Sequence, residues 1–185
     1  MAPSDRYGGA AITLHWLVAT LIAAALVLAW VLPHRRDPGY DLLLELHKSV
    51  GISVLLLAVL RLCWRYISPV LPAPGLTDME ARGSVAIHAL LYVIMIGIPL
   101  TGYLFSSAEG QSLNFFGIAT FASPLATDQT FSRPVEFLHK AGQWAVYGAV
   151  GLHVLAALYH YFVRRDGVLQ RMLPFLSSRA GAAAD

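Results

Sequence analysis

Residues 134–163 read PVEFLHKAGQWAVYGAVGLHVLAALYHYFV, and this stretch decides the fold that the sequence predicts. It is apolar over a length that, as a helix, crosses a bilayer core of roughly 30 Å. His139 and His153 are fourteen positions apart, so a helix places both rings on nearly one face, about 21 Å apart along its axis. Because ionisable side chains are costly inside a membrane, each histidine is a candidate functional residue. Two imidazoles at opposite depths indicate two metal centres, one near each membrane surface.

The composition of the whole chain is that of a membrane protein. Hydrophobic residues make up 57% of its 185 residues and charged residues only 13%, which is more apolar than a soluble domain. We therefore expect one transmembrane domain over residues 1–185, and the formal net charge of +2 gives no argument for nucleic acid as a partner. The single cysteine, Cys63, excludes a covalently attached c-type haem, a four-cysteine iron–sulfur cluster and an intramolecular disulfide. Any iron bound by this chain would therefore be coordinated mainly by histidine.

Apolar runs and turn signals predict an all-α fold, an integral membrane four-helix bundle. The expected spans are approximately residues 11–32, 47–66, 84–106 and 135–163. A short amphipathic piece over residues 41–46 is expected to precede the second span. The longest connection, residues 107–133, carries four phenylalanines, Phe115, Phe116, Phe121 and Phe131. These aromatics indicate that it lies against the membrane surface or caps the bundle.

Basic residues near the span ends predict the orientation. One side collects eight of them, namely Arg6, Arg61, Arg65, Arg82, Arg164, Arg165, Arg171 and Arg179. The other side collects five, namely Arg35, Arg36, Lys48, Arg133 and Lys140. By the positive-inside rule this bias places both termini in the cytoplasm.

The histidines fall into two groups by depth. The outer group contains His47 and His139, and the inner group contains His15, His88 and His153, with His160 nearer the inner boundary and His34 in a loop. Two imidazoles complete a six-coordinate haem iron suited to electron transfer, which favours His47 with His139 as the outer pair. For the inner centre, depth alone does not choose between His15 and His88 as the partner of His153. A single histidine could instead be hydrogen-bonded within the bundle. Three glycines lie in these spans, namely Gly51, Gly148 and Gly151. They could admit a flat cofactor between helices or allow close helix packing.

Several motifs resemble the bacterial cytochrome b561 family, and together they cover almost the whole chain. They are Leu14-His15-Trp16-Leu17 preceded by Arg6-Tyr7, Leu46-His47 followed by Gly51, Leu138-His139, and Gly151-Leu152-His153. The closing segment over residues 161–174, YFVRRDGVLQRMLP, is also similar. The resemblance implies a bundle with two non-covalent b-type haems, the inner one on His15 and His153 and the outer one on His47 and His139. It leaves His88 near the inner haem, and the localisation it implies is the bacterial inner membrane.

The resemblance also implies a function. Family members look like quinone-linked electron carriers, and some oxidise superoxide outside the membrane while reducing ubiquinone. We therefore expect an oxidoreductase that passes electrons between a periplasmic donor, with superoxide as the candidate, and the ubiquinone pool. Outer basic residues such as Lys48 and Lys140 could steer a small anion, or could bind haem propionates and lipid phosphates. The alternatives are an anchor and electron conduit for a hydrogenase or dehydrogenase subunit, and a haem-free metal transporter lined by histidines.

Overall fold

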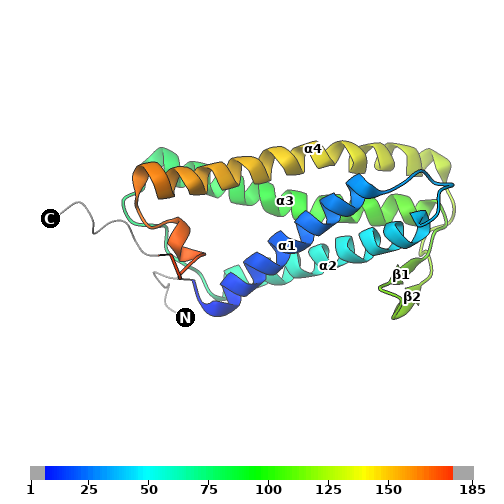
Figure 1. The fold of residues 1–185 in the computed structure, drawn as a ribbon, viewed down its shortest axis with the longest axis horizontal. Helices are drawn as coiled ribbons and strands as arrows, with labels where there is room; N and C mark the ends of the chain where they lie inside the picture. The colour runs from blue at the N-terminus through cyan, green and yellow to red at the C-terminus, as the bar shows by residue number, and fades with distance from the viewer. Residues whose placement is uncertain (1–6, 177–185) are drawn as a thin grey trace.

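The computed structural model describes residues 7–176, and four long helices account for most of them (Figure 1). Their bounds are α1 Gly9–Val31, α2 Tyr40–Ile67, α3 Asp78–Ala108 and α4 Gln129–Tyr159. Within the described residues, these four helices are long and apolar enough to cross a membrane. The prediction of an all-α membrane four-helix bundle is confirmed. Arg6 and Arg179, two of the basic residues that predict the orientation, lie outside the described residues.

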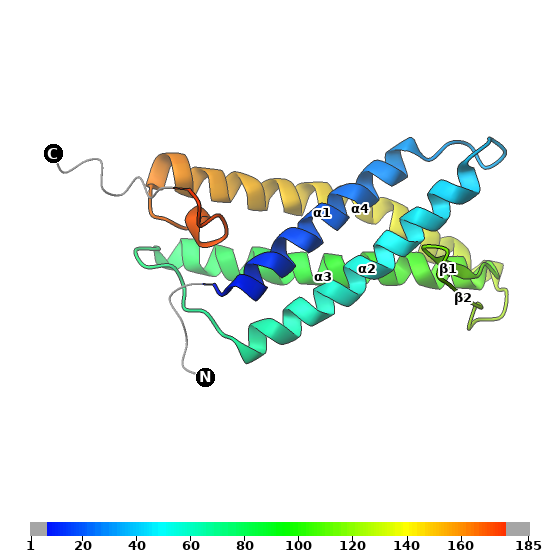
Figure 2. The same cartoon turned by 60° about the horizontal axis from the view of Figure 1, so that its bottom comes forward.

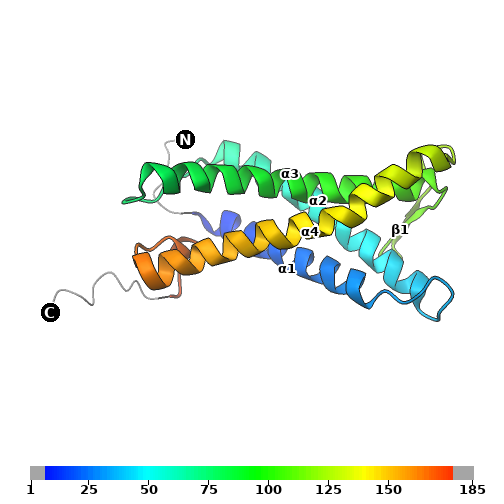
Figure 3. The ribbon, with the colours of Figure 1, turned by 90° about the horizontal axis from the view of Figure 1, so that it is seen from above.

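The helices form two neighbouring pairs, α1 with α2 and α3 with α4, and α2 also packs on α3. Figure 2 shows α1 and α2 crossing obliquely over α3 and α4, and Figure 3 shows from above that α3 and α4 lie apart at one end and cross near the other. One buried cluster joins α1, α2 and α3 around Val18, Val54 and Met95. A second joins α3 and α4 around Ile94 and Val146. Most other apolar side chains of the helices stay exposed, as expected when lipid is the surrounding solvent.

The helices begin earlier than the expected spans. The amphipathic piece over residues 41–46 is not separate but forms the first turns of α2. Helix α3 begins at Asp78 because Thr77 and Glu80 form a reciprocal capping box. Helix α4 begins at Gln129, where the Asp128 carboxylate accepts hydrogen bonds from two backbone N–H groups.

The connection between α3 and α4 contains a small β-hairpin that the sequence did not predict. Strand β1, Leu113–Phe115, pairs antiparallel with β2, Ala119–Phe121. The turn between them has two residues with positive φ, Phe116 at 50° and Gly117 at 73°, which is the pattern of a tight hairpin turn. The hairpin packs against α2.

Beyond α4 the chain turns back over the end of the bundle at which α1 begins. A single π-helical turn, His160–Arg164, ends the helix, and a short 3-10 helix, Leu169–Arg171, follows. The Trp16 indole N–H donates to the Met172 carbonyl over 2.9 Å. This bond fastens the closing segment to the start of α1.

Candidate functional site

The outer pair of histidines comes together inside the bundle. His47 projects from α2 and His139 from α4, and their ring centroids lie 6.2 Å apart with an interplanar angle of 84°. The two residues are more than ninety positions apart in sequence, so only the packing of the helices unites them. The facing rings could hold a metal centre between them.

Backbone carbonyls orient both outer rings. His47 Nδ1 lies 3.0 Å from the Ala25 carbonyl oxygen of α1, and His139 Nδ1 lies 2.9 Å from the Ile98 carbonyl oxygen of α3. A carbonyl only accepts hydrogen bonds, so each Nδ1 must carry the proton and donate. Each Nε2 then keeps a free lone pair, which is the tautomer that ligates a metal.

Helix α3 shapes the space that the His139 ring occupies. A Cβ on Gly102 would lie 2.7 Å from Cε1 and 3.0 Å from Nδ1 of that ring, so only glycine leaves room. The Phe105 ring flanks the imidazole with a centroid distance of 5.6 Å. The sequence did not reveal Gly102, because its only signal was a small residue one turn after Ile98, and nothing in the sequence tied it to His139.

The inner group unites three histidines from three helices. The ring of His153 on α4 lies 6.2 Å from that of His15 on α1 and 5.5 Å from that of His88 on α3. His88 Nδ1 lies 2.6 Å from the Ser84 carbonyl oxygen within its own helix. His15 Nδ1 is buried and has no hydrogen-bond partner among residues 7–176. The structure thus gathers all three rings in one place, as their similar depths predicted.

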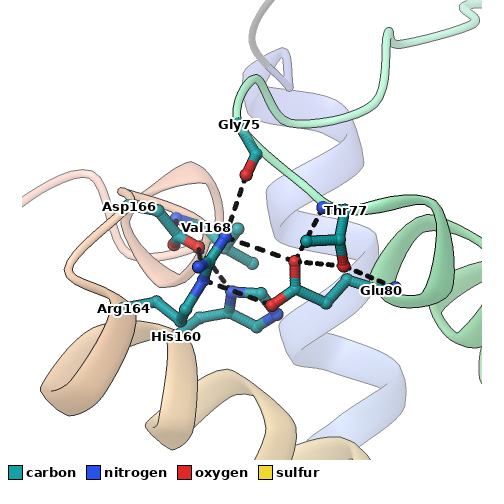
Figure 4. Close-up of polar contacts among 7 residues, drawn as sticks. All are labelled: Gly75, Thr77, Glu80, His160, Arg164, Asp166 and Val168. Carbon is teal, nitrogen blue, oxygen red and sulfur yellow. Dashed lines mark hydrogen bonds and ion pairs between the residues drawn. The ribbon is translucent and has the colours of Figure 1, made fainter.

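The other two histidines lie away from these groups. His160 is mostly buried, and its Nδ1 lies 2.6 Å from Oδ2 of Asp166 (Figure 4). In the same cluster, Arg164 Nε lies 3.2 Å from Oε1 of Glu80. This cluster joins the end of α4 to the start of α3. His34 is exposed in the loop between α1 and α2, as expected.

Two of the outer basic residues are already paired with carboxylates. Lys48 Nζ lies 2.8 Å from Oε1 of Glu45, and the Lys48 side chain is only 12% exposed. Lys140 Nζ lies 2.6 Å from Oε1 of Glu136. Because each pair is close to neutral, these lysines add little to a field that would attract an anion.

The fold and the paired imidazoles define a class of protein, a helical membrane protein whose histidines can hold metal-containing cofactors inside the bundle. A sequence model of the family described as prokaryotic cytochrome b561 matches residues 6–175. The chain belongs to the prokaryotic cytochrome b561 family, and it is therefore a haem-binding membrane protein of electron transport. The family implies b-type haem.

Relatives of known name support the same assignment. The protein named "Cytochrome b561 homolog 2" of Escherichia coli (strain K12) is 34% identical over 180 residues, which cover 96% of each chain. "Cytochrome b561 homolog 1" of the same strain is 29% identical over 92% of this chain and 98% of its own. "Probable superoxide oxidase CybB" of Yersinia pestis is 29% identical over 91% of this chain and 96% of its own. The similarity thus extends over nearly the full length of each protein.

Proposed function

We propose that this chain holds two b-type haems, one between His47 and His139 and one between His15 and His153. In this proposal it passes electrons between a periplasmic donor and ubiquinone. Each haem, when bound, supplies an iron that can accept and release one electron. The protein contributes the axial imidazoles, their orientation and their depth in the membrane.

The separation of the rings is the observation that carries the proposal. A metal–imidazole nitrogen bond is about 2.0 Å long, so two imidazoles that would hold one metal have ring centres at most roughly 6 Å apart. Both proposed pairs have a centroid distance of 6.2 Å. The ring of His88 lies 5.5 Å from that of His153, so the choice of His15 as the inner ligand rests on the resemblance to the cytochrome b561 family.

Open space beside the helices favours a flat cofactor. A Cβ at Gly51, Gly148 or Gly151 would meet no atom within 4 Å in the described part of the chain. Gly142 differs, because a Cβ there would collide with the Ile98 side chain where α3 and α4 pack closely. The first three glycines therefore contact no neighbouring helix in the described part of the chain, which is compatible with a porphyrin edge beside them.

The two centres lie at opposite ends of α4. Residues fourteen positions apart in a helix are separated by about 21 Å along its axis, so electrons that reach one centre can cross most of the bilayer by way of the other. We place both termini in the cytoplasm of a multi-pass protein of the bacterial inner membrane, with residues 1–185 acting as one domain. Six of the basic residues that support this orientation lie within residues 7–176, namely Arg61, Arg65, Arg82, Arg164, Arg165 and Arg171.

Superoxide is our proposed donor, and its support is the name of the Yersinia pestis relative. Any steering of superoxide toward the outer side would come from Arg35, Arg36 and Arg133. Among the described residues, none of these three takes part in an ion pair. Two superoxide anions would each give up one electron, and ubiquinone would take both with two protons.

A stopped-flow experiment tests this function. Protein reconstituted with ubiquinone in vesicles should accelerate ubiquinol formation when superoxide is generated outside. The matched variant His47→Ala should lose the acceleration, whereas Arg36→Lys should keep it because the charge is retained. If the wild-type protein holds two haems per chain but gives no acceleration, superoxide is not the donor.

A further inference from the structure

The β-hairpin at the outer end of the bundle presents an uncharged and largely apolar surface. Residues 111–127 contain no Asp, Glu, Lys, Arg or His. At and beyond the turn, Phe116 is 43% exposed, Ile118 is 82% exposed and Phe121 is 54% exposed. We call these three side chains the hairpin tip. In water, exposed apolar side chains gathered on one short hairpin indicate a contact surface.

Hydrogen bonds fix the hairpin to α2. The Asn114 backbone N–H donates to Oε2 of Glu45 over 2.9 Å, and the single hydrogen of the Ser49 hydroxyl is shared between the Glu45 carbonyl oxygen at 2.8 Å and the Asn114 carbonyl oxygen at 3.1 Å. The Phe116 backbone N–H in turn donates to Ser49 Oγ over 3.0 Å. Ser49 is fully buried. The hairpin therefore keeps its position relative to the start of α2, and it is not a free loop.

The hairpin projects sideways from the bundle. Figure 1 shows it below α2, within the length of the bundle and near the end at which α2 begins, so it does not extend the long axis. The bundle axis runs through the membrane, so a sideways projection at this level lies along the membrane surface. The helices expose many apolar side chains, as expected of a lipid-facing surface, and the side chains of the hairpin tip are exposed and apolar as well.

The turn itself holds an aromatic residue in an unfavourable conformation. Phe116 has φ of 50°, a region that bulky side chains rarely adopt and that Asn or Gly usually occupies in such turns. Backbone strain of this kind persists where the surroundings hold it in place. Here the hydrogen bond to Ser49 holds the backbone, and burial of the Phe116 ring in an apolar environment would stabilise this conformation.

We propose that the hairpin tip inserts into the outer leaflet of the bilayer, at the boundary between headgroups and acyl chains. The absence of charge over residues 111–127 favours lipid as the partner, because charged side chains are costly at the depth of the acyl chains and this segment has none. Aromatic and apolar side chains prefer this boundary. Since Glu45 and Ser49 flank His47 in sequence, the inserted hairpin would fix the depth of the outer histidine pair.

Spin-label accessibility tests the proposal. Ile118→Cys is labelled with a nitroxide in the full-length protein carrying Cys63→Ser, in vesicles of phosphatidylethanolamine and phosphatidylglycerol. The matched control is Arg36→Cys, in the charged loop at the same end of the bundle. We expect the label at position 118 to collide severalfold more with oxygen, and severalfold less with a water-soluble nickel chelate, than the label at position 36.

Equal access of the nickel chelate to both labels would overturn the proposal. Dipolar broadening between labels at high lipid-to-protein ratio would also overturn it, because the hairpin tip would then lie against a second copy. Phe121→Cys provides an independent site if the variant at position 118 does not accumulate. The same shielding from nickel is expected there, and its absence would count equally against insertion.

Discussion

Replacement of Gly102 by alanine should disturb the outer centre and leave the inner one unchanged. The new Cβ would lie 2.7 Å from His139 Cε1, whereas carbon atoms prefer separations of about 3.5–4.0 Å. The ring must therefore retreat by about 1 Å. That movement breaks the bond of His139 Nδ1 to the Ile98 carbonyl, now 2.9 Å long, because such bonds extend to only about 3.2 Å.

The loss can be given a rough size. Leaving a buried polar partner unsatisfied costs about 1–3 kcal/mol, which corresponds to an affinity for the outer haem roughly 5- to 150-fold weaker. Reduced-minus-oxidised spectra and a redox titration of the purified Gly102→Ala protein would measure the outer haem separately from the inner one. Gly83→Ala is the matched control, since it lies on the same helix and its Cβ would meet nothing within 4 Å among the described residues.

Both haems at normal content and with unchanged potentials in Gly102→Ala would refute the reasoning, because the close contact would then have no consequence. The same loss in Gly83→Ala would also refute it. In that case the effect would come from a changed α3 and not from contact with His139.

Two further predictions concern neighbouring polar contacts. Glu45→Gln should weaken both the ion pair with Lys48 and the hydrogen bond from the Asn114 N–H. The local stability of the hairpin should then fall by about 1–3 kcal/mol, and amide hydrogen exchange over residues 113–121 should accelerate. Unchanged exchange would contradict the anchoring role of Glu45. His88→Ala should leave both haems bound, because the proposed inner ligands are His15 and His153 and His88 only lies beside them, its ring 5.5 Å from that of His153. Haem quantification measures this, and loss of the inner haem would move the ligand from His15 to His88.

Much of the fold could be predicted from the sequence because hydropathy and length determine which segments cross a membrane. The depths of the histidines followed from the same pattern. The grouping of His47 with His139 also followed, since both lie at the outer ends of their spans. The choice among the inner histidines did not follow from depth, because His15 and His88 lie at similar levels and only the packing of α1, α3 and α4 sets their distances to His153.

Other features could not be predicted, for identifiable physical reasons. The Ala25 and Ile98 groups that orient the outer rings are backbone carbonyls, and every residue has one. The clearance at Gly102 depends on how α3 and α4 pack. The hairpin escapes prediction because its strands are three residues long and its turn begins with Phe116, which is not a usual turn residue.

The pairing of the outer lysines, in contrast, has a signal in the sequence. Glu45 and Lys48 are three positions apart, and Glu136 and Lys140 are four positions apart. Side chains at these spacings are neighbours on a helix, and the structure shows both ion pairs formed. The two spacings therefore indicate a weaker steering field than a count of the outer basic residues suggests.

The haem content of single and double histidine variants tests the central claim most directly. We predict two haems per chain in the wild-type protein, one in His139→Ala, one with a complementary spectrum in His153→Ala, and none in the double variant. Both haems retained in either single variant would contradict the assignment of four imidazoles to two centres.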